Sequence, residues 1–124
     1  MVSIFTRLLH QKETLRIYGD GRQTRDFIYA GDVANAVAAS LSTQAPSGTY
    51  NVSTGTQTSV LELIECLSRV ARIVPEVKQE QPRTGDILHS ALDPSLLQQA
   101  TGWKACMPLE EGLKRTYESL TSAF

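Results

Sequence analysis

The chain has 124 residues, of which 41% are hydrophobic and 20% charged, a composition typical of one globular domain and not of a disordered or fibrous protein. Lys and Arg number 12 against 13 Asp and Glu, so the formal net charge of -1 gives no basic footprint and no nucleic-acid partner is expected. No apolar run approaches the roughly 20 residues that cross a bilayer, so no membrane partner is expected either.

The N-terminus and the cysteines bear on the cellular compartment. Residues 1–10 lack the basic start, continuous apolar stretch and small-residue cleavage site of a secretory signal peptide. Cys66 and Cys106 do not have the spacing of a metal site, and we interpret them as reduced thiols. Both observations favour a cytoplasmic protein.

The first third of the chain predicts one helix and two short strands. Apolar residues recur at helical spacing over residues 4–9. Residues 15–18 alternate apolar and polar side chains, which predicts a strand that ends at the glycine turn 19–21. A cluster of aromatic and β-branched side chains predicts a second strand at 27–29.

The middle of the chain predicts a helix followed by a third short strand. An apolar stripe of helical period covers residues 32–41, and Asp32 stands where an N-cap is expected. A break rich in proline, serine and glycine follows, and residues 49–52 then have the composition of a strand.

Three further helices are predicted from their boundaries and periodicity. Ser59 and Glu62 form a capping box before the clearest amphipathic pattern, which runs to residue 71. An Asp-Pro pair begins a short helix within 93–102 that closes at a glycine, and apolar spacing predicts the last helix at 109–120.

About five helices and four short strands in irregular alternation favour a mixed α/β (α+β) fold in a single domain, 1–124. The strands are too few and too short for a complete doubly wound sheet. Neither G-x-G-x-x-G nor a P-loop occurs, and the turn 19–21 follows a strand without leading into a helix. His10 and His89 lack the paired spacing of a zinc site. We therefore predict no metal site, no cofactor site and no catalytic residue.

Five short motifs carry a resemblance that covers essentially the whole chain. They are the stretches at 17–29 (IYGDGRQTRDFIY), 32–34 (DVA), 50–55 (YNVSTG), 83–86 (RTGD) and 93–113. In this order they closely resemble the C-terminal part of NAD-dependent nucleoside-diphosphate-sugar epimerases and dehydratases. These enzymes belong to the extended short-chain dehydrogenase/reductase family, which includes UDP-glucose 4-epimerase.

The resemblance implies that this chain corresponds to the lobe that binds the nucleotide sugar. In the family, a separate N-terminal Rossmann domain carries the NAD loop and a Tyr-x-x-x-Lys pair, and neither motif occurs in this sequence. The chain alone is therefore expected to bind no NAD and to be inactive. Two positions depart from the family pattern: Gly31 replaces a common acidic residue and Thr84 a common proline.

The resemblance also implies the site residues. Arg25 and Arg83 match arginines that contact the diphosphate, and a guanidinium suits that group because it donates two parallel hydrogen bonds. Asp86 matches an aspartate near the ribose, although an ordinary turn aspartate explains it equally well. The remaining matches are Tyr29, beside the nucleotide or simply a half-buried aromatic, and the base-side strand residues Ile17 and Tyr18.

Other singled-out residues are interpreted as structural or solvated. We expect Asp26 to be structural, Asn51 to bond to nearby backbone, Arg22 to lie in a solvated loop and Trp103 to fill the core above a short helix.

Two alternatives to the lobe of an enzyme remain open from the sequence. One is a non-catalytic binding or regulatory module, and the other is a structural remnant that persists as an oligomer. The apolar residues of 4–9 are expected to be left uncovered, as is the face around Arg25 and Tyr29. A homodimer, or association with a Rossmann domain, would cover them.

Overall fold

The computed structural model describes residues 1–42 and 44–122. Within these ranges the helices are α1 (Val2–His10), α2 (Ala30–Ser42), α3 (Val60–Ala71), α4 (Ser95–Thr101) and α5 (Leu109–Thr121). The strands are β1 (Leu15–Tyr18), β2 (Thr24–Arg25), β3 (Thr58–Ser59) and β4 (Val77–Glu80). The predicted α+β class, with its five helices and short strands, is confirmed.

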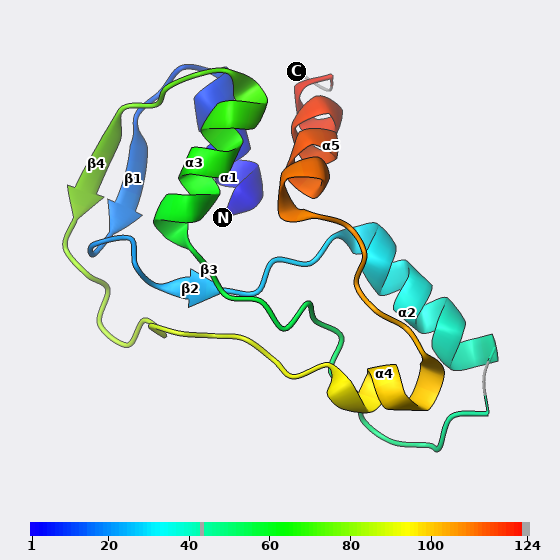
Figure 1. Cartoon of the computed structure of the whole chain (residues 1–124). Coiled ribbons are helices and arrows are strands. Elements are labelled where there is room, and N and C mark those ends of the chain that lie inside the picture. The colour runs from blue at the N-terminus through cyan, green and yellow to red at the C-terminus, as the bar shows by residue number, and fades with distance from the viewer. Residues whose placement is uncertain (43, 123–124) are drawn as a thin grey trace.

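The strands form two small sheets. β1 runs parallel to β4, with Leu15 opposite Val77, and β2 runs antiparallel to β3, with Thr24 opposite Ser59. Each sheet has two strands among the described residues, so these residues build no doubly wound sheet. Helices α1, α3 and α5 lie side by side with the β1–β4 pair at their flank, whereas α2 and α4 lie at the opposite end (Figure 1).

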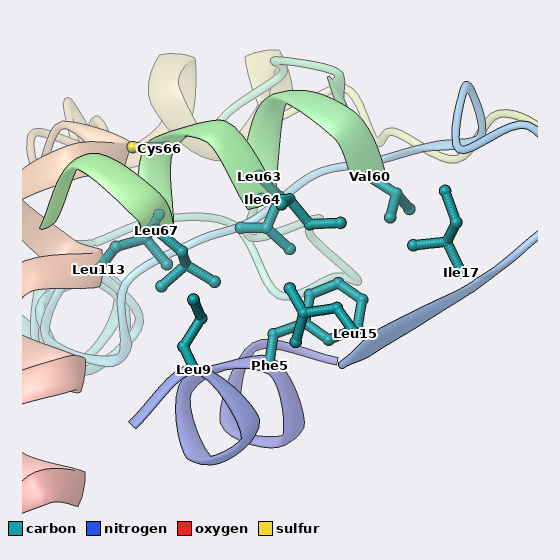
Figure 2. Close-up of a cluster of buried hydrophobic side chains, with 10 residues drawn as sticks. All are labelled: Phe5, Leu9, Leu15, Ile17, Val60, Leu63, Ile64, Cys66, Leu67 and Leu113. Carbon is teal, nitrogen blue, oxygen red and sulfur yellow. The ribbon is translucent and has the colours of Figure 1, made fainter. Parts of the chain in front are cut away.

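The larger core lies between α1, α3, α5 and β1. Figure 2 shows α3 directing Leu63, Ile64 and Leu67 toward the apolar side chains of α1 and β1. Leu63 is fully buried, and complete burial of a leucine contributes about 1.5–3 kcal/mol relative to exposure. The whole cluster consists of Phe5, Leu9, Leu15, Ile17, Val60, Leu63, Ile64, Cys66, Leu67 and Leu113.

The expectation that α1 exposes its apolar residues is wrong for two of them. Phe5 and Leu9 are buried because α3 and α5 pack across that face of the helix. Ile4 remains 52% exposed. The uncovered part of α1 is therefore narrower than its sequence suggests.

A second, smaller core joins α2, α4 and the chain that follows α4. It contains Ala36, Leu97 and Trp103, with Tyr50 and Val52 packed against its edge. The role predicted for Trp103, a buried side chain next to the short helix, is confirmed.

The start of α3 and the end of α4 are confirmed where the local signals predict them, whereas α4 begins at Ser95, one residue later than the Asp-Pro pair predicts. Ser59 Oγ accepts a hydrogen bond from the Glu62 amide at 3.2 Å, and Glu62 Oε2 accepts one from the Ser59 amide at 2.7 Å. Gly102 ends α4 in the left-handed region, with φ of 73°, where a residue without Cβ is favoured.

The strands predicted at 27–29 and 49–52 are wrong. β2 lies earlier, at Thr24–Arg25, and neither predicted segment is in a strand. Phe27 packs against the larger core, while Ile28, Tyr50 and Val52 pack against the smaller one. These side chains have the residue types that strands favour because they are half-buried, although their backbones pair with no neighbouring strand.

The predicted N-cap role of Asp32 is also wrong, because α2 begins two residues earlier at Ala30. The Asp32 carboxylate instead accepts hydrogen bonds from the amides of Cys106 at 3.1 Å and Met107 at 2.9 Å, and from Cys106 Sγ at 3.2 Å. Trp103 Nε1 donates to the Asp32 carbonyl at 3.1 Å. Asp32 therefore connects α2 to the segment that leads into α5.

Candidate functional site

A cavity of about 870 Å³ lies beside α1 and β1, within the size range of small-molecule sites. α1 supplies an apolar wall through Ile4, Phe5 and Leu8. The other walls come from β1, β2 and the chain between β4 and α4. Five of the six residues predicted from the sequence line this cavity together: Ile17, Tyr18, Arg25, Arg83 and Asp86.

The Arg25 guanidinium is fixed by three hydrogen bonds. Nη1 donates to the carbonyl oxygens of Thr24 and Ile87, both at 2.7 Å, and Nη2 donates to Asp86 Oδ1 at 3.0 Å. A guanidinium has five N–H donors, so two remain for an anionic ligand. The side chain is 27% exposed, which leaves these donors accessible from the cavity.

Arg83 lines the same cavity, and its guanidinium rests on an aromatic ring. Its Cζ lies 3.8 Å from the centre of the Tyr18 ring, within the distance of a cation–π contact. A left-handed Gly85 (φ 81°) lies in the turn that follows, in which the Asp86 amide donates to the Arg83 carbonyl at 3.2 Å. Because of this turn, Arg83 and Asp86, which are three residues apart in sequence, both line the cavity.

The sequence reasoning missed the other polar residues that line the cavity, which are Lys12, Glu13, Thr14, Arg16 and Gln23. Lys12 and Arg16, together with Arg25 and Arg83, give the cavity four basic side chains against two acidic ones, Glu13 and Asp86. Gln23 Nε2 donates to the Tyr18 carbonyl at 2.9 Å and ties the chain before β2 to the end of β1. The alternation within β1 is a signal that could have found Arg16, because it lies on the side opposite the buried leucine and isoleucine.

Tyr29, the sixth predicted residue, lines a different cavity of about 580 Å³ next to α5. A Cβ atom at Gly31 would lie 2.7 Å from Tyr29 Cε1, so the glycine at this position leaves room for the ring. The Arg115 guanidinium lies 6.0 Å from the ring centre on the α5 side. The structure therefore brings together five predicted residues and places the sixth elsewhere.

The structural roles predicted for Asp26 and Asn51, and the solvated loop predicted for Arg22, agree with their contacts. Asp26 accepts hydrogen bonds from the Thr54 amide and hydroxyl, at 3.1 and 2.6 Å, and from the Gly55 amide at 2.8 Å. Asn51 Nδ2 donates to the Asp93 carbonyl at 3.4 Å. Arg22 is exposed in its loop, with a long ion pair of 3.8 Å to Asp20.

The titratable groups with shifted pKa values lie outside the larger cavity. Burial opposes ionisation of Asp32, but the hydrogen bonds from Met107 and Cys106 outweigh it and hold the pKa of its carboxyl below the ordinary value. The hydrogen bond to Asp32 raises the pKa of the Cys106 thiol, and burial raises that of Cys66. Both cysteines are free thiols, and these raised pKa values favour the protonated thiol over the thiolate.

The described residues offer neither a metal-binding cluster nor a glycine turn suited to a dinucleotide. In residues 1–42 and 44–122, no group of three His, Cys, Asp or Glu side chains is arranged to hold a metal ion, and no helix is long and apolar enough to cross a membrane. A Cβ at Gly21 would lie 2.8 Å from Leu61 Cγ, so this glycine permits close packing against α3. The turn that contains it leads into β2, and it does not provide the helix N-terminus that holds a dinucleotide pyrophosphate.

Comparison with known proteins identifies the family. The sequence profile described as GDP-mannose 4,6 dehydratase matches residues 1–116. The chain belongs to this family. UDP-glucose 4-epimerase of Mycolicibacterium smegmatis, for example, is 32% identical over 118 residues, which cover 95% of this chain and 38% of that protein.

Solved structures share the fold as well as the sequence. UDP-glucose 4-epimerase from Thermotoga maritima, crystallised with UDP-glucose, matches with a TM-score of 0.92 and 33% identity over 98% of this chain and 39% of its own. The complex of Thermus thermophilus UDP-glucose 4-epimerase with NAD matches with a TM-score of 0.86 and 34% identity, covering 99% and 40% respectively. The resemblance predicted from the motifs is thus confirmed, and the chain spans about two fifths of the length of these relatives.

Proposed function

We propose that this chain forms the lobe of a nucleotide-sugar epimerase or dehydratase that binds the nucleoside diphosphate of the sugar substrate. The observation that carries the proposal is the convergence of Arg25 and Arg83 on one cavity from segments about 60 residues apart. A diphosphate presents several charged oxygens, which two guanidinium groups can contact together. The relative crystallised with UDP-glucose supports a uridine nucleotide as the first ligand to test.

Each of the other lining residues has a place in this proposal. Asp86 uses Oδ1 for Arg25, and its second oxygen is suited to accept a hydrogen bond from a ribose hydroxyl. Ile17 and Tyr18 provide the β1 wall on which we place the base. Because Tyr29 lines the second cavity, we do not include it among the ligand contacts.

We further propose that residues 1–124 constitute only this lobe, and that NAD binding and catalysis reside in the rest of the family's architecture. The sequence has no Tyr-x-x-x-Lys pair, and its glycine turn packs against α3. The 124-residue chain should therefore neither bind NAD nor convert a UDP-hexose. Turnover of UDP-glucose by the purified chain, free of host enzymes, would refute this part of the proposal.

Calorimetric titration tests the nucleotide site. We expect UDP to bind more tightly than UMP, since both arginines are assigned to the diphosphate. Arg25→Lys and Arg83→Lys should each weaken UDP binding by about 1–3 kcal/mol, because an ammonium group cannot reproduce the fork of a guanidinium. Arg22→Lys is the matched control, since Arg22 is exposed and absent from the cavity lining. Unchanged UDP affinity in both site variants would show that the nucleotide binds elsewhere.

We also propose that the isolated chain forms a homodimer through the surface around the exposed part of α1. Met1 and Ile4 are 45% and 52% exposed and border the cavity. Exposed apolar patches are commonly covered by a partner, and two-fold pairing lets one patch cover itself. Light scattering over a dilution series tests this, and a strictly monomeric chain at high micromolar concentration would refute it.

A further inference from the structure

The chain between β4 and α4 has little packing of its own to fix it. Every residue from 81 to 93 is exposed, and the segment runs as an extended loop past β2 before it reaches α4 (Figure 1). This 81–93 segment nevertheless carries two of the five residues that meet at the larger cavity, Arg83 and Asp86. Some other part of the molecule must therefore set their positions.

Two backbone hydrogen bonds attach the 81–93 segment to β2. The Thr24 amide donates to the Leu88 carbonyl at 2.8 Å, and the Ser90 amide donates to the Thr24 carbonyl at 3.2 Å. The Thr24 hydroxyl also lies 3.1 Å from His89 Nδ1. These contacts are all centred on residues 88–90. The start of the segment is held at β1, where the Gly19 amide donates to the Glu80 carbonyl at 3.0 Å and the Arg83 guanidinium lies over the Tyr18 ring.

The neighbouring residue of β2, Arg25, holds the part between these two attachments, at residues 86–87. Arg25 Nη1 donates to the Ile87 carbonyl and Nη2 to the Asp86 carboxylate, across 62 and 61 residues of sequence. A third bond, to the Thr24 carbonyl, fixes the guanidinium to β2 itself. One planar group thus bridges β2 to two consecutive residues of the segment, whereas the single nitrogen of a lysine could not span the same acceptors.

We infer that Arg25 is a positioning residue, which holds the 81–93 segment against β2 and thereby sets Arg83 and Asp86 at the cavity. The inference rests on the proposed function only in that Arg83 and Asp86 are taken to contact the nucleotide. It adds to any direct contact that Arg25 makes with a ligand. The loss of Arg25 should therefore loosen the segment even when no nucleotide is present.

The first test needs no ligand. In Arg25→Gln and Arg25→Lys, amide hydrogen exchange at Thr24 and Ser90, followed by NMR, should accelerate about tenfold, since two charge-assisted hydrogen bonds to the segment are lost. Tryptic cleavage between Arg83 and Thr84, measured by mass spectrometry of the released fragment, should accelerate in parallel. The amide of Leu67 in α3 should be unaffected, and Arg22→Lys serves as the control variant. Unchanged exchange and cleavage in the Arg25 variants would overturn the inference.

Asp86→Ala provides a second variant, which removes the acceptor of the Arg25–Asp86 ion pair and leaves Arg25 in place. It removes only the Nη2 bond, so its effect on exchange and cleavage should be smaller than that of Arg25→Gln. In the double variant with Arg25→Gln, the second substitution should add nothing. Independent, additive acceleration would mean that Asp86 does not act through Arg25, and would also overturn the inference.

UDP titration then separates positioning from direct binding. If Arg25 sets the position of Arg83, then Arg83→Lys should weaken UDP binding less in the Arg25→Gln background than in the unmodified chain. Additive losses would identify Arg25 as an independent ligand contact and refute the positioning role. Failure of the unmodified chain to bind UDP would refute the proposed function alone, because the exchange and cleavage results stand without a ligand.

Discussion

Replacing Asp32 with alanine should lower the free energy of unfolding by about 3–4.5 kcal/mol. Its carboxylate accepts two backbone hydrogen bonds, from Cys106 and Met107, and a hydrogen bond to a charged group contributes about 1.5–3 kcal/mol. Cys106 is exposed, so water can satisfy its amide after the substitution, and the lower half of the summed range is the better expectation.

Asp32→Asn removes the negative charge of the side chain while it keeps the side chain's size, so it measures how much of the stabilisation depends on the charge. The amide oxygen can still accept from the two backbone amides while Nδ2 faces Cys106 Sγ, so the loss should be about half that of alanine. Asp20→Ala is the matched control, because Asp20 is exposed, and it should cost less than about 1 kcal/mol.

The assay is urea denaturation followed by two signals. Trp103 is the single tryptophan and donates to the Asp32 carbonyl, so its fluorescence reports on this part of the molecule, while circular dichroism reports on the helices. Coincident transitions for both signals justify a two-state free energy. A stability of Asp32→Ala within about 0.5 kcal/mol of the unmodified chain would refute the reasoning.

The same contribution should depend on pH. Because folding lowers the pKa of Asp32, its stabilisation is complete above the ordinary aspartate pKa of about 3.9 and is lost as pH falls through the lower pKa of the folded state. The difference between the unmodified chain and Asp32→Ala should therefore be constant from pH 5 to 7 and shrink as pH falls below about 4. A difference that grows in acid would contradict the assigned direction of the pKa.

Three further predictions concern stability, and urea denaturation checks each of them. Leu63→Ala should cost about 3–5 kcal/mol because this fully buried side chain lies at the centre of the core, and a loss under about 1 kcal/mol would contradict that placement. Ser59→Ala should lower the free energy of unfolding by about 1 kcal/mol through loss of the capping box. An unchanged stability would mean that the capping box does not stabilise α3. Gly21→Ala should lower the free energy of unfolding by more than about 1 kcal/mol, because φ is 77° and the new Cβ would lie 2.8 Å from Leu61 Cγ. An unchanged stability would contradict the close packing of this turn against α3.

The helices could be predicted because their signals are local. The capping box and the apolar spacing of α3 lie within 13 residues of one another and need no knowledge of the rest of the fold. Gly102 marks the end of α4 by its own conformational preference. In both helices, the residues that mark the boundary lie within the helix or directly next to it.

The strands were harder to predict because their partners are distant in sequence. β4 is exposed at three of four positions and mostly polar, and it is a strand only through its pairing with β1. β2 and β3 have two residues each, too few for an alternating pattern. The apolar residues at 27–29 and 49–52 gave the opposite error, because they are half-buried without a strand to pair with.

The site was predictable to the extent that the family motifs carry it. They assigned Arg25, Arg83 and Asp86, which meet at one cavity, but no local signal showed that Asp86 bonds to Arg25 across 61 residues. The position of Tyr29 depends on the space at Gly31, a departure from the family pattern whose effect becomes visible only when the ring is placed.

The parallel pairing of β1 with β4 matters for the chain while it is being made. β1 is complete at residue 18, but its partner is not complete until residue 80. At a synthesis rate of roughly 5–20 residues per second, the edge of β1 that pairs with β4 stays without this partner for roughly 3–12 s. An unpaired strand edge can recruit other chains, and a charged side chain on such a strand discourages this. Arg16, which points away from the core in the middle of β1, gives the nascent chain that protection before its partner arrives.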